Sequence, residues 1–226
     1  MIASLIGFNG SLTSLDVCSN RITGGDGAQQ LAAAVLCHPT LETFCRIPLN
    51  ELRADRLTTL ELGKEGIGVP GALVLAELLR TVSCSLTSLN LMDNNVGHEG
   101  AAAVAKALRV DGLLTSLNLQ SNSICDAGAV AIADALRVSG SLKSLDLKKN
   151  SIGLEGGAAI AEALHVNGSL TSLSLYCNSI GIDGAKAIGA ALAGNCSLMD
   201  LNFGGNHIGA LGSTMQLQKR CVSTAV

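Results

Sequence analysis

The side chains best suited to metal binding or covalent catalysis are spread along the whole chain. The four histidines stand far apart, at His38, His98, His165 and His207. None has a second histidine or a cysteine three or four residues away, the spacing that places two ligands on one face of a helix, so the sequence predicts no metal site. No serine or cysteine stands in a recognisable arrangement with a histidine, so we predict no catalytic residues and no enzyme activity.

One glycine pattern could bind the phosphates of a dinucleotide. Residues 66–71 read GIGVPG, which fits the pattern G-x-G-x-x-G between an expected strand and an expected helix. However, the Ile67-Gly68 pair recurs as Ile152-Gly153 and as Ile180-Gly181. We therefore interpret these glycines as parts of a repeated turn and predict no cofactor.

The cysteines are too irregularly placed to indicate a disulfide framework. They stand at Cys18, Cys37, Cys45, Cys84, Cys125, Cys177, Cys196 and Cys221. The chain also starts without the basic segment and the long apolar stretch of a secretory signal. We expect most of these residues to be free thiols in a reducing compartment, and the protein to be cytoplasmic.

Composition restricts both the core and the partners. The 226-residue chain is 48% hydrophobic, yet it has only three phenylalanines, one tyrosine and no tryptophan, so leucine, isoleucine, valine and alanine must fill the core. The formal net charge is −3 and no lysine or arginine cluster is present, so nucleic acid is not expected as a partner. No apolar run reaches the roughly 18 residues of a membrane span, so a membrane is not expected either.

Internal repetition is the strongest signal in the sequence. Five blocks open on leucines that are 28 residues apart, at Leu86, Leu114, Leu142, Leu170 and Leu198. Looser copies open at Ser11 and Leu57, and a truncated, irregular unit lies near 41–56. We interpret residues 1–226 as a single domain of about eight units, with an atypical C-terminal end at 213–226.

Each full unit combines two hydrophobic periods. The block L-x-x-L-x-L-x-x-N-x-I alternates apolar and polar residues as a short strand does. The second half changes to helical spacing; in one unit it places Ile160, Ala161 and Leu164 on one face and Glu162 on the other. Strands stacked side by side are narrower than helices, so the stack must curve with its helices outside.

These blocks resemble the leucine-rich-repeat family, and within it the long-repeat, ribonuclease-inhibitor-like subclass. That subclass also supplies the repeat regions of NOD-like receptors and of the Ran GTPase-activating protein. The resemblance covers roughly residues 11–212. It implies an α/β solenoid, a horseshoe or arc with a parallel concave β-sheet and convex α-helices.

The resemblance also implies a role for a recurrent asparagine after each strand. In the family this residue is buried and bonds neighbouring backbone groups; here it stands at Asn20, Asn94, Asn122, Asn150, Asn178 and Asn206. The series is interrupted at Glu65 and around Asn50. We therefore expect the solenoid to be distorted between about residues 38 and 68.

The polar residues that flank the buried leucines are expected on the concave face, where the fold leaves their identity free. The richest group of these residues consists of Met92, Gln120, Asp146, Lys148 and Tyr176. Tyr176 is the only tyrosine, and tyrosine is among the residues in which binding energy concentrates. We predict that these five residues bind a protein partner.

The predicted function is a non-catalytic protein–protein interaction scaffold in intracellular regulation or signalling. Two alternatives stay open. One is a GTPase-activating module resembling the Ran GTPase-activating protein, for which the candidate basic side chains, none of them in a matching family motif, are Arg21, Arg46, Arg53, Arg80, Arg109 and Arg137. The other is a repeat fragment of a larger NOD-like receptor. The sequence leaves the partner and the oligomeric state open.

Overall fold

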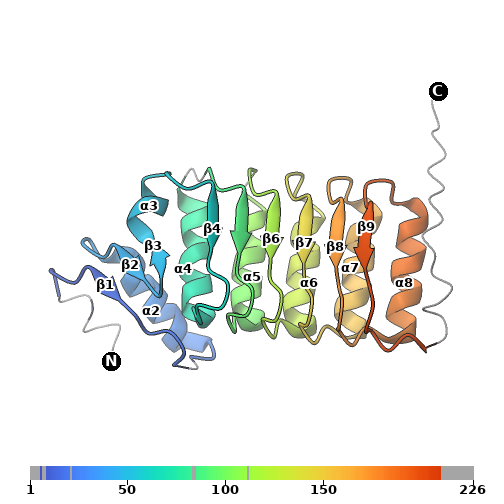
Figure 1. The fold of residues 1–226 in the computed structure, drawn as a ribbon, viewed down its shortest axis with the longest axis horizontal. Helices are drawn as coiled ribbons and strands as arrows, with labels where there is room; N and C mark the ends of the chain where they lie inside the picture. The colour runs from blue at the N-terminus through green and yellow to red at the C-terminus, as the bar shows by residue number, and fades with distance from the viewer. Residues whose placement is uncertain (1–5, 7–8, 21, 83–84, 111, 210–226) are drawn as a thin grey trace.

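The computed structural model describes residues 6, 9–20, 22–82, 85–110 and 112–209. In this part of the chain strands and helices alternate, and the strands form one layer with the helices behind them (Figure 1). Most of the sheet is built from short strands, namely β4 (Thr59–Glu61), β5 (Ser88–Asn90), β6 (Ser116–Asn118), β7 (Ser144–Asp146), β8 (Ser172–Ser174) and β9 (Asp200–Asn202). Helices α4 (Gly68–Thr81), α5 (Gly97–Leu108), α6 (Cys125–Leu136), α7 (Leu154–Val166) and α8 (Gly181–Gly194) cover it.

The six strands from β4 to β9 pair in chain order, and every pair is parallel. Their register follows the sequence period, because Leu89, Leu117, Leu145 and Leu173 are successive partners. The α/β solenoid with a parallel sheet is thus confirmed. Backbone bonding also continues past the strand ends, as when the Leu62 amide donates to the Asn90 carbonyl at 2.9 Å.

Apolar side chains from both layers meet between the sheet and the helices. The central strand leucines are at most 1% exposed from Leu89 to Leu173. On α7, Ile160, Ala161 and Leu164 are buried while Glu162 is exposed, as their spacing predicts. Thin layers without tryptophan suffice because each unit is covered by its neighbours.

A glycine in the first turns of each regular helix allows neighbouring units to approach closely. At Gly156 an added Cβ would lie 2.7 Å from Ile152 Cγ2 and 2.8 Å from Ala129 Cβ of the preceding helix. Both distances are below van der Waals contact, so a larger residue would push α6 and α7 apart. The helix spacing in this part of the solenoid depends on that absent side chain.

Buried asparagines join the turns of successive units. Asn150 is 0% exposed; its Nδ2 donates to the Leu119 carbonyl at 2.8 Å, and its Oδ1 accepts from the Asn122 amide at 2.8 Å. The same bonds recur in neighbouring turns at Asn122 and Asn178, and Asn94 keeps the donor bond, to the Leu62 carbonyl, while its Oδ1 accepts from the Ile67 amide. This is the ladder that the sequence predicts, and it satisfies polar groups that would be costly to bury alone.

A second asparagine pair lies at the opposite edge of the solenoid, where the sequence pattern indicates only the end of a helix. Asn167 Nδ2 donates to the Leu136 carbonyl at 2.6 Å, and Asn195 Nδ2 donates to the Leu164 carbonyl at 2.6 Å. Asn167 Oδ1 accepts from the Leu170 amide, and Asn195 Oδ1 accepts from the Leu198 amide, both at 2.8 Å. The turn before each of these strands is therefore cross-linked to the unit before it.

The prediction that Asn20 is buried in the same ladder is wrong. Asn20 is exposed, and its Nδ2 donates to the carbonyl of Val17 in its own turn at 3.0 Å. The physical reason is that the next unit along the chain is the truncated one, which supplies no equivalent turn. Instead, the Ser19 amide donates to the carbonyl of Gly66, one unit further on, at 3.2 Å.

The first units form a separate group at the blue end of the arc (Figure 1). Strands β1 (Ser14–Leu15) and β2 (Thr43–Phe44) are parallel, whereas β2 and β3 (Ile47–Pro48) form an antiparallel hairpin. The short helix α3 (Leu49–Arg53) follows, and α2 (Gly25–Cys37) packs against α4. The sheet is thus interrupted within the segment where the sequence predicts a distortion, while the helix layer continues. The atypical end proposed at 213–226 lies outside the described residues.

Replacing Asn150 by alanine should lower the free energy of unfolding by about 3 kcal/mol, because buried backbone groups of two units lose their partners. Asn20→Ala is the matched control: it occupies the same repeat position but is exposed, so its effect should stay below about 1 kcal/mol. Urea unfolding followed by circular dichroism measures both variants. Equal effects of the two substitutions would contradict the ladder's role.

Cys125 stands at a turn position that favours glycine. Its φ is 57°, and the corresponding residues Gly68, Gly97 and Gly181 have φ between 63° and 70°. A left-handed conformation costs a residue with a side chain roughly 1–2 kcal/mol. Cys125→Gly should therefore raise the free energy of unfolding by about 1 kcal/mol. Cys125→Ala, which removes the thiol but keeps Cβ, should leave it nearly unchanged; equal gains in the two variants would disprove the backbone explanation.

Candidate functional site

Four of the five residues proposed to bind a partner form one continuous row on the outer face of the sheet, which is the concave face of the arc. Met92, Gln120, Lys148 and Tyr176 each follow a fully buried leucine, and all four are half-buried. Backbone bonds join neighbouring members of the row: the Ser121 amide donates to the Lys148 carbonyl at 2.8 Å, and the Lys149 amide donates to the Tyr176 carbonyl at 2.9 Å. We call these four residues and Asp146 the concave patch.

Side-chain packing makes one end of the concave patch a defined surface. The Lys148 ammonium lies 5.1 Å from the centroid of the Tyr176 ring, within the range of a cation–π contact. The ring also covers Gly204, where an added Cβ would lie 3.1 Å from two ring carbons. Because Gly204 has no side chain, the Tyr176 ring can pack directly against the backbone there.

Glycine also borders the other end of the concave patch. A Cβ added at Gly63 would lie 3.7 Å from the methyl group of Met92, and Gly63 occupies the same row one unit earlier. The row thus runs from a flexible thioether through an amide and an ammonium group to an aromatic ring. Such a surface offers apolar contact at both ends and hydrogen-bond donors between them.

The residues at the strand ends are less free than the sequence suggests. Asp146 Oδ1 accepts from the Lys148 amide at 2.8 Å, and Asn90 and Asn118 make the equivalent bond to Met92 and Gln120 at 3.0 Å. These bonds close the chain as it leaves the strand and fix where the next side chain points. The expectation that the fold leaves the strand-end residues free is therefore wrong for Asn90, Asn118 and Asp146. Asp146 instead fixes the backbone at Lys148.

Tyr176 is electrostatically coupled to the next residue. A side-chain hydrogen bond with Cys177, followed by the charge of its thiolate, raises the pKa of the Tyr176 phenol above its ordinary value. The phenol is therefore protonated at neutral pH and can donate a hydrogen bond to a partner.

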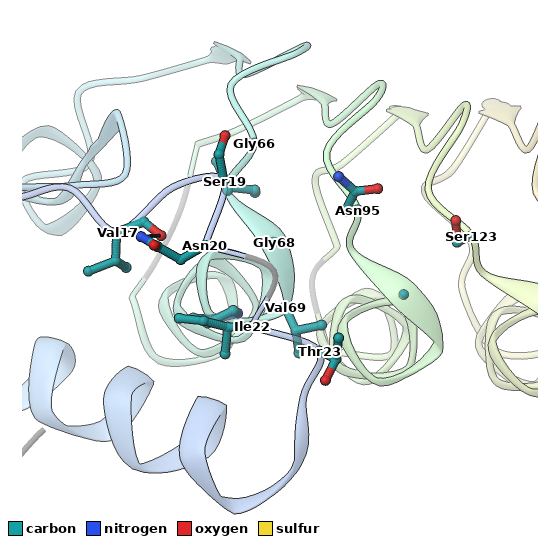
Figure 2. Close-up of a pocket in the computed structure, with 13 residues that line it drawn as sticks. Val17, Ser19, Asn20, Ile22, Thr23, Gly66, Gly68, Val69, Asn95 and Ser123 are labelled. Atoms are coloured by element: carbon teal, nitrogen blue, oxygen red, sulfur yellow. Dashed lines mark hydrogen bonds between the residues drawn. The ribbon is translucent and has the colours of Figure 1, made fainter. Parts of the chain in front are cut away.

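A cavity of about 720 Å³ lies where the first unit leaves the stack. Figure 2 shows Val17, Asn20 and Ile22 of the first unit together with Gly66 and Val69 at the start of α4. None of the described lining residues is charged, and Ser19, Asn20, Thr23, Asn95 and Ser123 supply its polar side chains. Among the lining residues that the structure describes, none could act as a general acid or base.

The glycine pattern at residues 66–71 borders this cavity and is explained by the fold. Gly66 and Gly68 have φ of 65° and 63°, as the turn into α4 requires. A Cβ on Gly71 would lie 2.6 Å from Ile67 Cβ, and Ile67 is 2% exposed. All three glycines thus have structural reasons, in keeping with their interpretation as a repeated turn.

Sequence reasoning missed one group of side chains that the fold brings together. The potential ligand atoms of Asp16, Cys18 and Cys45 all lie within 4.8 Å of one another. Cys45 is 1% exposed, whereas Cys18 is half-buried and Asp16 is exposed. Burial is the main cause that raises the pKa of both thiols, so they are poor nucleophiles. Cys18 and Cys45 stand about one repeat length apart in the sequence, and this spacing is the signal that could have placed them on neighbouring strands.

The parallel register of units with one strand and one helix each defines a curved β/α repeat solenoid. A family model described as "Leucine Rich repeat" matches residues 82–105, 113–133, 139–161, 166–189 and 194–212. The chain belongs to the leucine-rich-repeat family, as its blocks predict. Among the described residues, no helix is long and apolar enough to cross a membrane.

Solved structures include similar folds. The structure of leiomodin-1 actin-binding site 2 is 20% identical, with a TM-score of 0.52 over 75% of this chain and 83% of that chain. The tropomodulin C-terminal domain of Caenorhabditis elegans is 17% identical, with a TM-score of 0.46 over 68% of this chain and 78% of that chain. The Legionella pneumophila leucine-rich-repeat protein LegL7 is 17% identical, with a TM-score of 0.39 over 86% of this chain and 83% of that chain. The likeness to leiomodin-1 shows a shared fold, and no curated protein matches the sequence.

Because Tyr176 is the only tyrosine, its titration can be followed directly by phenolate absorbance. The phenol should titrate above its usual pKa of about 10. Cys177→Ala should move the pKa downward, since the thiol hydrogen bond and the thiolate charge both favour the neutral phenol. Cys37→Ala, at the exposed end of α2, is the control and should leave it unchanged. An unchanged pKa in Cys177→Ala would show that the two side chains are not coupled.

Proposed function

We propose that the protein is a non-catalytic scaffold whose concave patch binds a protein partner. The observation that carries the proposal is the continuous row Met92, Gln120, Lys148 and Tyr176, one residue from each of four adjacent units. The buried leucines and asparagines hold the fold, so the row's side chains are available for contact. A pre-formed surface also loses little conformational entropy on binding.

The row has the composition of a binding surface. Tyr176 provides a large, rigid ring, and Lys148 provides a cation held beside it. Aromatic and methionine side chains are enriched at interfaces, and the most strongly contributing residues include tyrosine. The Asp146 bond fixes the backbone at Lys148, and the contact with Tyr176 holds the ammonium group beside the ring.

GTPase activation has less support. An arginine that enters a partner's active site must be free to move, but Arg53 donates to the carbonyls of Leu41, Val35 and Leu36. Arg80 is bonded to Glu77, and Arg137 to Glu162. These contacts engage three of the candidate arginines. The receptor-fragment alternative and the cytoplasmic location stay predictions from the sequence.

The test compares binding of one purified partner to three proteins. The partner is isolated with the unmodified chain as bait and then titrated against it, against Lys148→Glu/Tyr176→Ala, and against Lys106→Glu. The control makes the same change of charge on α5, in the convex layer. The double variant should bind at least tenfold more weakly, since losing a well-packed aromatic contact costs about 2 kcal/mol. The control should bind like the unmodified chain.

Two measurements make the outcome decisive. Circular dichroism and elution volume must show that the double variant is folded, which we expect because both side chains are only half-buried. Equal affinity of the double variant and the unmodified chain would refute the concave patch. Because the similar leiomodin-1 structure is that of an actin-binding site, purified actin is a suitable first defined partner for the same titration.

A further inference from the structure

The interruption of the solenoid places two thiols and one carboxylate in a single group. Asp16 and Cys18 follow β1, and Cys45 follows β2. The parallel pairing of Leu15 with Phe44 aligns the two segments, and the Cys45 amide donates to the Leu15 carbonyl at 3.0 Å. The group therefore depends on backbone pairing between the first unit and the truncated unit.

Local bonds hold the ligand atoms where they are. Asp16 Oδ1 accepts from the Cys18 amide at 2.9 Å, which ties the carboxylate to the backbone next to the first thiol. Cys45 and Arg46 have φ of 45° and 64°, so they form the left-handed turn between β2 and β3. Arg46 Nε lies 3.8 Å from Asp16 Oδ2. The group is thus fixed from three sides and open to solvent at Asp16.

We propose that Asp16, Cys18 and Cys45 bind a thiophilic divalent cation, of which Zn²⁺ is the representative. Zinc binds thiolates at about 2.3 Å and carboxylate oxygens at about 2.0–2.2 Å, usually with four ligands. Two sulfurs that share one zinc ion lie at most about 4.6 Å apart, and the ligand atoms of this group all lie within 4.8 Å of one another. Both cysteines are free thiols in the structure, so both sulfurs are available as ligands.

Charge balance supports a divalent ion. Each thiol releases its proton to solvent as its sulfur binds the metal, so two thiolates and one carboxylate face the ion. The ion cancels two of these three negative charges, and the guanidinium of Arg46 lies beside the third. Water completes the coordination on the exposed side at Asp16.

The experiment titrates chelator-treated, reduced protein with Co²⁺, which reports thiolate ligation by a near-ultraviolet charge-transfer band. The unmodified chain should show this band and lose it when Zn²⁺ displaces Co²⁺. Cys18→Ser keeps one of the two thiolates, so it should show at most about half of the band per bound Co²⁺ and bind at least tenfold more weakly. Cys37→Ser, which removes an exposed thiol of the same unit, should bind like the unmodified chain.

Asp16→Asn keeps the acceptor for the Cys18 amide but removes the charge, so it should retain the fold and bind several-fold more weakly. If Cys18→Ser does not fold, the Co²⁺ affinity of Asp16→Asn serves as the test instead. A band of full intensity at unchanged affinity in Cys18→Ser, or unmodified protein that gives no band, overturns the proposal. A Cys18–Cys45 disulfide in protein purified under reducing conditions also overturns it. Partner binding at the concave patch is independent of each result.

Discussion

One polar constraint determines how the units are stacked. The backbone carbonyl that follows each strand is buried between two turns, and the amide of an asparagine from the next unit bonds it, as Asn150 bonds Leu119. The Oδ1 atom of Asn150 also accepts a hydrogen bond from the backbone amide of Asn122 in the preceding unit. Both bonds are lost if either unit shifts, because a buried amide has no water to replace them. The register is therefore held at the turns, while the leucines fill the core.

The first units show what happens where that constraint is absent. Glu65 replaces the asparagine in one unit, and the truncated unit has no matching turn. The strand layer breaks there, Asn20 is exposed, and a cavity of about 720 Å³ remains beside it. The helix layer does not break, because α2 packs directly against α4. Continuous strand pairing therefore requires a complete repeat unit at each step, whereas the helix layer continues across the truncated unit.

The sequence predicts the regular part of the fold because a 28-residue period allows only one register between neighbouring strands. Once the leucines are aligned, the partners of Leu117 and Leu145 follow without further information. Asp16, Cys18 and Cys45 are not found in this way, since Cys45 lies in the truncated unit, which lacks the repeated pattern by which the other units are aligned. Asp146 is misjudged for another reason: its alternation places it on the outer face, but only the folded structure shows that it bonds the Lys148 amide.

The concave patch shows how such a scaffold separates stability from specificity. Adjacent strands are about 4.8 Å apart, so four units place their row within roughly 15 Å. That length is close to the width of one helix with its side chains, so one partner element can contact all four units at once. Each of these residues follows a leucine that stays fully buried whatever its neighbour is. If the concave patch binds a partner as proposed, a substitution at Gln120 or Lys148 changes the contact surface while the ladder and the core, which lie on the other side of the backbone, keep its shape.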